Sequence, residues 1–228
     1  MPLHKIEKIL APAETKDTFF RRIERIYSPY SKEYGFIYRA YIDAENAFSD
    51  IYRDNGDVYF THVRAVAIIL IDYLYIFDRG DLTISIHEII AAALLHDVIE
   101  DRPDEWSLER INRDYSKNTT LIVDCVSKKP LSYFNDSVED QLDFYHTRLS
   151  TINIVEVILL KLSDRLHNQT TLWNCNTDKI RRKMEETINI YIVLAKKWGV
   201  LVHELEKTVE GFEERLKMHM KQCEVSTS

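Results

Sequence analysis

Apolar residues recur at helical spacing along almost the whole chain, and this pattern limits the fold more than any other feature. No stretch alternates polar and apolar residues for more than a few positions, as a half-buried β-strand would. The 228 residues include only 5 Gly and 5 Pro, where average usage gives roughly 16 and 11. So few turn-forming residues exclude a loop-rich β-sandwich, a collagen-like repeat and a Gly-rich dinucleotide-binding fold. We therefore predict an all-α fold.

About ten helices follow from this periodicity. Their predicted ranges are 18–27, 33–52, 62–77, 85–96, 107–115, 120–127, 138–149, 155–173, 178–198 and 200–221. Turn-forming residues at 55–57, 79–81 and 129–130 separate several of them, and Gly199 lies where a helix C-terminus favours glycine. Residues 63–77 and 89–95 are apolar on nearly all sides, so we expect both segments to be central and buried.

Charge and hydropathy exclude several kinds of partner. Thirty Lys and Arg against 37 Asp and Glu give a net charge of −7, which disfavours nucleic acid and anionic membranes as partners. The longest apolar run, residues 65–77, contains Asp72 and is shorter than the roughly 20 residues that span a bilayer. The first ten residues lack the apolar segment of a secretory signal. We expect a cytoplasmic protein that does not bind membranes, with Cys125, Cys175 and Cys223 as reduced thiols.

One predicted helix ends abruptly in polar side chains, in the run LLHDVIED at residues 94–101. A neutral imidazole and a carboxylate are both metal ligands, and His96 and Asp97 are adjacent. Glu100 and Asp101 follow within one turn, close enough to position a metal-bound water or to protonate a leaving oxygen. On its own, the run fits a solvated helix end first, and a metal site is the alternative.

A second polar group lies within an otherwise apolar helix. Lys161, Asp164, Asn168 and Thr171 are spaced 3, 4 and 3 residues apart, which brings all four to one face. One interpretation is an ordinary solvent-exposed stripe. The other is that Asp164 completes a metal site while Lys161, Asn168 and Thr171 contact a phosphorylated ligand.

The roles expected for the remaining histidines depend on the residues around them in the sequence. His62 opens a helix after a plausible N-cap, Thr61, and alone it would be a structural or surface residue. His167 points about 100° away from Asn168 around the helix, so we do not predict it as a ligand. Surface or core positions are expected for His4, His87, His146, His203 and His219.

Taken together, these elements resemble the HD-domain phosphohydrolases and, more narrowly, the alarmone hydrolase domain of the RelA/SpoT homologue family. The matching segments, in the family's order, are RDNGDVYFTHVRAVAIIL (53–70), AAALLHDVIED (91–101), VDCVSKK (123–129), KLSDRLHNQTTL (161–172) and EETINIYIVLAKKWG (185–199). The resemblance implies an HD-domain helical bundle over residues 31–200. We expect residues 1–30 to form an N-terminal helical extension, and residues 201–228 a C-terminal helix with a frayed tail.

The resemblance also implies a site. One divalent ion, typically manganese, would be held by His62, His96, Asp97 and Asp164. Two imidazoles and two carboxylates form a fairly hard ligand set that suits manganese or iron, with cobalt or zinc as alternatives. Glu100 and Asp101 match the family's acidic pair, which activates water and assists the leaving group. The implied substrate contacts are Arg53, Asn55, Lys161, Asn168 and Thr171.

The implied reaction is hydrolysis of the 3′-pyrophosphate of guanosine tetra- or pentaphosphate, giving GDP or GTP and pyrophosphate, by a hydrolase-only chain. The partner is then a small-molecule guanosine alarmone, and self-association into a homo-oligomer is left open. One alternative is the same metal chemistry on another phosphorylated nucleotide such as NADPH. The other is a nucleotide-binding regulatory module without turnover.

Five positions depart from the family's pattern: Phe48, Ile51, Asn55, Val63 and Val193. The first three lie nearest the expected base pocket. They therefore bear on the identity of the nucleotide more than on metal binding.

Overall fold

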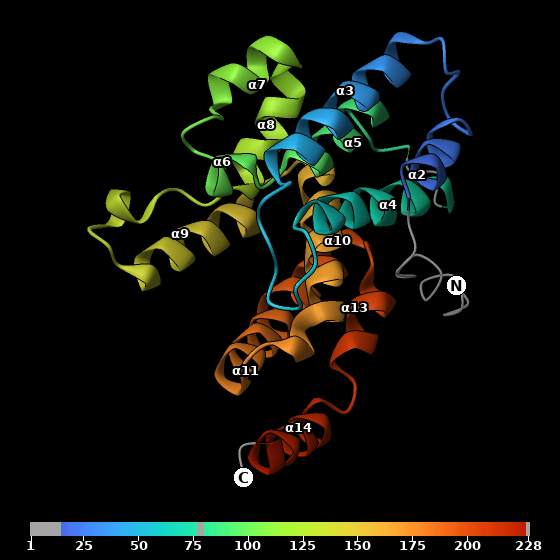
Figure 1. Cartoon of the computed structure of the whole chain (residues 1–228). Helices are drawn as coiled ribbons and strands as arrows, with labels where there is room; N and C mark the ends of the chain where they lie inside the picture. Colours follow the sequence, from blue (N-terminus) through green and yellow to red (C-terminus); the bar gives the residue numbers. More distant parts are fainter. Residues whose placement is uncertain (1–14, 77–79, 227–228) are drawn as a thin grey trace.

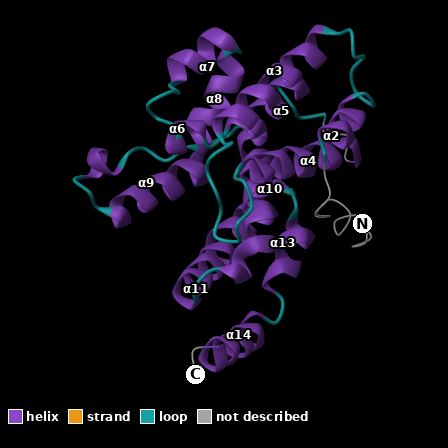
Figure 2. Ribbon diagram, in the orientation of Figure 1, coloured by secondary structure: helices purple, strands orange, loops and turns teal. Residues whose placement is uncertain are grey.

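The computed structural model describes residues 15–76 and 80–226, and within these ranges the elements are helices joined by loops (Figure 2). The predicted all-α class is confirmed. An isolated antiparallel bridge between Tyr52 and Val58 is the only strand-like pairing in the described ranges. The first half of the predicted N-terminal extension, which contains His4, lies outside them, as does the side chain of Cys223.

The described helices follow the sequence signals for helix starts. In chain order they are α2 (Lys16–Ile23), α3 (Lys32–Ala47), α4 (Phe60–Ile76), α5 (Ile86–Leu95), α6 (Val98–Asp101), α7 (Leu108–Asp114), α8 (Lys117–Val126), the 3₁₀ turn η1 (Leu131–Phe134), α9 (Val138–Thr151), α10 (Val155–Thr171), the 3₁₀ turn η2 (Leu172–Asn174), α11 (Thr177–Glu186), the π turn η3 (Thr187–Tyr191), α12 (Ile192–Trp198), α13 (Val202–Val209) and α14 (Phe212–Ser226). Short polar side chains accept first-turn N–H groups at six helix starts: Thr15, Ser31, Ser107, Ser116, Ser137 and Asn176.

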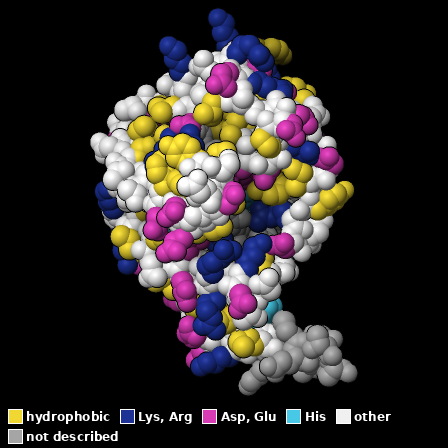
Figure 3. Space-filling model, turned by 90° about the vertical axis from the view of Figure 1, so that its left-hand side faces the viewer, with side chains coloured by type: hydrophobic (Ala, Val, Ile, Leu, Met, Phe, Trp, Pro, Cys, Tyr) yellow, Lys and Arg dark blue, Asp and Glu magenta, His cyan; other side chains and the backbone are white. Residues whose placement is uncertain are grey.

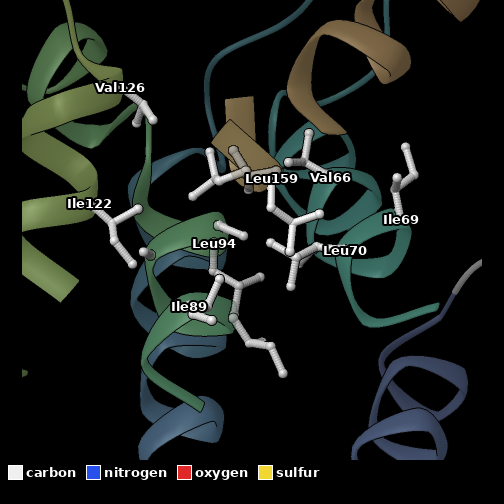
Figure 4. Packing of buried hydrophobic residues seen from close by; sticks show 14 of the residues in the cluster. Val66, Ile69, Leu70, Ile89, Leu94, Ile122, Val126 and Leu159 are labelled. Atoms are coloured by element: carbon white, nitrogen blue, oxygen red, sulfur yellow. The ribbon is translucent and has the colours of Figure 1, made fainter. Parts of the chain in front are cut away.

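Helices α5 and α10 form the centre of the bundle (Figure 1). Helix α5 packs against α3, α4 and α8, and α10 packs against α4, α8, α12 and α13. Figure 4 shows the apolar side chains that fill the space between these helices: Val66, Ile69, Leu70, Ile89, Leu94, Ile122, Val126 and Leu159. The predicted central segments are confirmed, since residues 89–95 are all buried and 63–73 mostly so, whereas Tyr75 is exposed.

The two ends of the described chain pack differently. Phe19, Phe20 and Ile23 of α2 belong to the same apolar core as α4 and α5. By contrast, Phe212 and Leu216 of α14 form a second cluster with side chains of η2 and α11. No described helix is both long enough and apolar enough to cross a membrane.

The predicted helix over residues 33–52 ends early, at Ala47. Here Arg102 donates a 2.6 Å hydrogen bond from Nε to the Ala47 carbonyl, so a side chain replaces the next turn of helix. The following residues form a tight loop in which Tyr59 N donates to Ile51 O at 2.7 Å. Gly56 turns this loop with a φ of 84°. The change matters because the loop, not the helix, carries Arg53 and Asn55.

The predicted helix over residues 200–221 is two helices, α13 and α14. Gly211 lies between them with a φ of 63°, a left-handed conformation that glycine adopts without steric cost. The predicted helix over 178–198 spans α11 to α12 and contains the π turn η3; Gly199 ends it with a φ of 64°, as expected.

Candidate metal centre and active site

Three packed helices bring the predicted metal ligands together. His62 lies in the first turn of α4, Asp164 in the second half of α10, and His96 and Asp97 in the turn that links α5 to α6. Because α4, α5 and α10 all contact one another, residues 67 positions apart in the chain meet at one point. This is how helix bundles generally build metal sites, from side chains on facing helices.

The four side chains converge on a small volume. His62 Nε2 lies 3.3 Å from Asp164 Oδ1 and 3.5 Å from Asp97 Oδ2. His96 Nε2 lies 3.0 Å from Asp97 Oδ2 and 3.8 Å from Asp164 Oδ1. The donor atoms of His62, His96 and Asp164 all lie within 4.8 Å of one another. Such spacings fit donor atoms about 2.1 Å from a shared ion.

The imidazole of His96 is oriented as a metal ligand. Its Nδ1 lies 2.8 Å from the Ala93 carbonyl, which can only accept, so Nδ1 carries the proton when the ring is neutral. Its Nε2 then has a free lone pair. That atom is buried, and its 3.0 Å approach to Asp97 Oδ2 does not make a hydrogen bond. A buried nitrogen without a partner, facing two carboxylates, fits a bound cation.

The charges of the cluster also favour a bound positive charge. Burial alone would raise the pKa of Asp164, but Lys161 and the two imidazoles outweigh it and hold that pKa well below its usual range. Burial would likewise lower the pKa of His96, yet Asp97 and Asp164 raise it to about 10. The two carboxylates therefore stay ionised and attract a positive charge, either a proton on His96 or a divalent ion.

Three neighbouring side chains hold the carboxylates in place. The Tyr59 hydroxyl donates a 2.8 Å hydrogen bond to Asp97 Oδ2. Lys161 Nζ donates to Asp164 Oδ2 at 2.8 Å, and Asn168 Nδ2 donates to Asp164 Oδ1 at 2.6 Å. Lys161 is buried, which excludes the solvent-exposed stripe as the explanation of this face of α10.

The predicted acidic pair lies on α6 at the wall of the same pocket. Glu100 accepts hydrogen bonds from the backbone N (2.8 Å) and from Nζ (3.0 Å) of Lys128. Asp101 as a residue is exposed at the pocket rim. Partial desolvation of its carboxyl, together with the negative charges of Asp97 and Glu100, raises its pKa to about 6. A carboxyl with a pKa near neutrality can exchange a proton at physiological pH.

The predicted substrate contacts form one connected group. Arg53 Nη2 donates 2.9 Å hydrogen bonds to both Asn168 Oδ1 and Thr171 Oγ1. Asn55 lines the pocket as well, although its amide bonds to Asp57 within the loop. Phe48, one of the unusual positions, is buried against the ring of Tyr59 at a centroid distance of 5.1 Å.

The pocket that contains these residues is rich in both signs of charge. Figure 3 shows a face hollowed near its middle, where basic and acidic side chains lie beside one another. The cations of the pocket wall are Arg53, Lys128, Lys161, Arg165, Lys179 and Lys183, and the carboxylates are Asp54, Asp97, Glu100, Asp101, Asp164 and Glu186. The formal charges balance, so a divalent ion would make the pocket positive overall and suited to a polyphosphate.

Sequence reasoning missed several of these residues. Four basic residues of the pocket wall were not predicted, because tertiary packing places their side chains there: Lys128, Arg165, Lys179 and Lys183. His167 is not predicted as a ligand because it points away from Asn168, yet its Nδ1 lies 2.8 Å from Nδ1 of the predicted ligand His62. Its position three residues after Asp164, on the same side of α10, was the available signal.

Comparison with known proteins agrees with this arrangement. The model of the HD domain family matches residues 40–201, and this chain belongs to that family. The bifunctional (p)ppGpp synthase/hydrolase SpoT of Escherichia coli K12 is 36% identical over 178 residues, which are 77% of this chain and 23% of SpoT. The guanosine-3′,5′-bis(diphosphate) 3′-pyrophosphohydrolase of Aquifex aeolicus is 33% identical over 187 residues, 81% of this chain and 25% of that protein. The chain thus spans about a quarter of the length of these relatives.

A solved structure supports the fold. It is described as a metazoan orthologue of SpoT that hydrolyses ppGpp and has a role in starvation responses. It superposes with a TM-score of 0.54 at 21% identity and covers 84% of this chain and 96% of its own. The predicted HD-domain fold and the resemblance to alarmone hydrolases are confirmed.

Proposed function

We propose that this protein is a metal-dependent pyrophosphohydrolase that removes the 3′-pyrophosphate of guanosine tetra- or pentaphosphate and releases pyrophosphate with GDP or GTP. The observation that carries the proposal is the convergence of His62, His96, Asp97 and Asp164 beside a cationic pocket wall. The activities named for the relatives support the choice of substrate, since they match this chain over the segment that contains the site.

The proposed cofactor is one divalent ion held by His62, His96, Asp97 and Asp164. Two imidazole nitrogens and two carboxylate oxygens are a fairly hard donor set, which suits manganese or iron, with cobalt and zinc as alternatives. When bound, such an ion supplies a lowered pKa for water and positive charge for the phosphoryl oxygens.

Glu100 and Asp101 have different roles in the proposed proton transfers. Asp101 retains a proton near neutral pH more readily than an ordinary carboxyl, so it is suited to protonate the leaving oxygen. Glu100 lies 3.0 Å from Lys128 Nζ and is suited to orient the attacking water and accept its proton. Lys161 acts through Asp164, which it holds at hydrogen-bond distance.

The polyphosphate would be held by the pocket cations, and the nucleoside by the group around Arg53. Arg53 already hydrogen-bonds to Asn168 and Thr171, so these side chains are ordered before a ligand binds. Binding a nucleoside there would therefore cost little side-chain entropy. Asn55 would contribute from the same loop.

The test is product analysis with guanosine tetraphosphate, with and without manganese. We expect equimolar GDP and pyrophosphate with Mn²⁺ and no turnover after chelation. Release of inorganic phosphate from NADPH, without pyrophosphate release from the alarmone, would instead support a phosphatase of another nucleotide. Tight alarmone binding without turnover in Mn²⁺, Fe²⁺ and Co²⁺ would indicate a regulatory module.

A further inference from the structure

The ligand His62 uses both of its ring nitrogens. Its Nε2 faces the carboxylates, 3.3 Å from Asp164 Oδ1 and 3.5 Å from Asp97 Oδ2. Its Nδ1 lies 2.8 Å from Nδ1 of His167, and the two rings lie 4.9 Å apart between centroids. His62 is 1% exposed, so water does not compete for either contact.

A hydrogen bond between two imidazole nitrogens contains one proton, which belongs to one of the two rings. Metal binding at His62 Nε2 determines which ring donates it. A neutral His62 can present a lone pair from Nε2 only if its own proton is on Nδ1. His62 Nδ1–H then donates, His167 Nδ1 accepts, and the proton of neutral His167 is on its Nε2. The opposite arrangement would aim an N–H from His62 at the position of the ion.

We propose that His167 is a positioning residue of the metal centre: as the acceptor for His62 Nδ1–H, it fixes the tautomer and the ring orientation in which His62 Nε2 binds a divalent cation. The inference rests on the metal centre of the proposed function. The other ligand imidazole has a simpler partner of the same kind, because His96 Nδ1 pairs with the Ala93 carbonyl.

The packing of the helices places His167 beside His62. Helix α10 packs against α4, and this contact brings the two imidazoles together. His167 lies three residues after Asp164 on α10, so a single helix supplies one metal ligand and the support of another. Movement of α10 relative to α4 would therefore displace Asp164 and release His62 together.

The test compares two substitutions that differ in one property. In His167→Asn the amide Oδ1 can lie near the former Nδ1 position and accept from His62, whereas His167→Leu has similar bulk and no acceptor. Mn²⁺ affinity is measured from the free-ion signal in electron paramagnetic resonance, which requires no substrate. We expect His167→Leu to weaken Mn²⁺ binding roughly 10–100-fold and His167→Asn to restore most of it.

A matched control and a second readout complete the experiment. Thr170→Ala removes an exposed hydroxyl that donates to the backbone carbonyl of His167 and leaves the imidazole in place, so this variant is expected to bind Mn²⁺ like the unchanged protein. In Zn²⁺-loaded protein with ¹⁵N-labelled histidine, His62 should show a protonated Nδ1 and a metal-bound Nε2. Equal losses in both His167 variants, or none in His167→Leu, would overturn the proposal.

These outcomes are separate from those that test the activity. An unchanged protein that binds Mn²⁺ but does not hydrolyse the alarmone would refute the proposed function, and the comparison of the His167 variants would still decide this inference. An unchanged protein that binds no divalent ion would refute the inference together with the metal centre.

Discussion

Lys161 and Asp164 form a buried ion pair one turn apart on α10, with 2.8 Å between Nζ and Oδ2 and side chains that are 8% and 7% exposed. The other oxygen of Asp164 faces His62 and His96. One carboxylate therefore links a permanent cation of the protein to the position proposed for the ion. This arrangement keeps Asp164 ionised and directs Oδ1, which also accepts from Asn168, toward the two imidazoles.

Replacement of Lys161 by methionine removes the partner but keeps much of the side-chain volume. The buried Asp164 carboxylate then loses its main compensating charge, so we expect the metal-free protein to lose about 3 kcal/mol of its free energy of unfolding. Urea denaturation in the presence of a chelator measures this loss. Mn²⁺ should restore part of it, because the ion binds only the folded protein.

The pair of Lys207 and Glu210 at the C-terminal end of α13 is the control: it also joins a lysine to a carboxylate three positions later, but its side chains are 36% and 68% exposed. Lys207→Met should cost less than about 1 kcal/mol, since water screens the pair. Equal effects of the two substitutions would show that burial of the Lys161 pair does not matter.

Substitution Glu100→Gln separates metal binding from the chemical step. Glutamine can still accept from the Lys128 backbone N–H but has no charge and accepts protons poorly. We expect Mn²⁺ affinity to stay within about 2-fold and kcat for the alarmone to fall by roughly 10²–10⁴. The exposed Asp104→Asn, in the loop after α6, should change neither quantity. A fully active Glu100→Gln protein would refute the role given to the acidic pair.

The fold class could be predicted from local apolar spacing, whereas the set of predicted metal ligands was implied by the family resemblance and not by any single local pattern. Apolar spacing identifies the helices, and His62, His96–Asp97 and Asp164 each stand at a recognisable position on one of them. The contact of His167 with His62 could not be predicted in this way, because a helical wheel shows the direction of His167 on α10 but not what α4 presents to it.

The ends of some helices were also not predicted from the sequence, again for a physical reason. The helix that starts near residue 33 stops at Ala47 because Arg102, 55 residues away, satisfies the Ala47 carbonyl. Nothing near Ala47 in the sequence signals that bond. By contrast, Gly211 was a local signal, and the break between α13 and α14 could have been predicted from it.

A substitution at Tyr59 tests whether its hydroxyl supports Asp97 as a proposed metal ligand. In Tyr59→Phe the ring can keep its contacts with Phe48 and His62, whose centroids lie 5.1 Å and 5.4 Å away, while Asp97 loses the 2.8 Å hydrogen bond. Loss of an outer partner of a metal ligand weakens binding, so we expect the Kd for Mn²⁺ to rise about 10-fold. Isothermal titration calorimetry measures it. Tyr52→Phe, at a 64% exposed position in the same loop, is the control, and equal Kd values for the two variants would contradict this role of Tyr59.

The last prediction concerns the pH dependence of stability, away from the metal site. Asp124 on α8 lies 2.5 Å from Arg148 on α9 and 2.9 Å from Lys129. Burial would raise its pKa, but the two cations outweigh burial and lower it. A carboxyl whose pKa is lower in the folded state stabilises the protein above the unfolded pKa of about 3.9 and loses this contribution as the pH falls further.

Asp124→Asn should therefore lower the free energy of unfolding by about 1 kcal/mol at pH 7, and the difference from the unchanged protein should shrink below about pH 4. Urea denaturation from pH 7 to pH 3 measures both values, with the exposed Asp143→Asn on α9 as the control. A difference that stayed constant down to pH 3 would mean that Asp124 contributes through shape or neutral hydrogen bonds, because only the ionised carboxylate can lose its attraction to Arg148 and Lys129 over that interval.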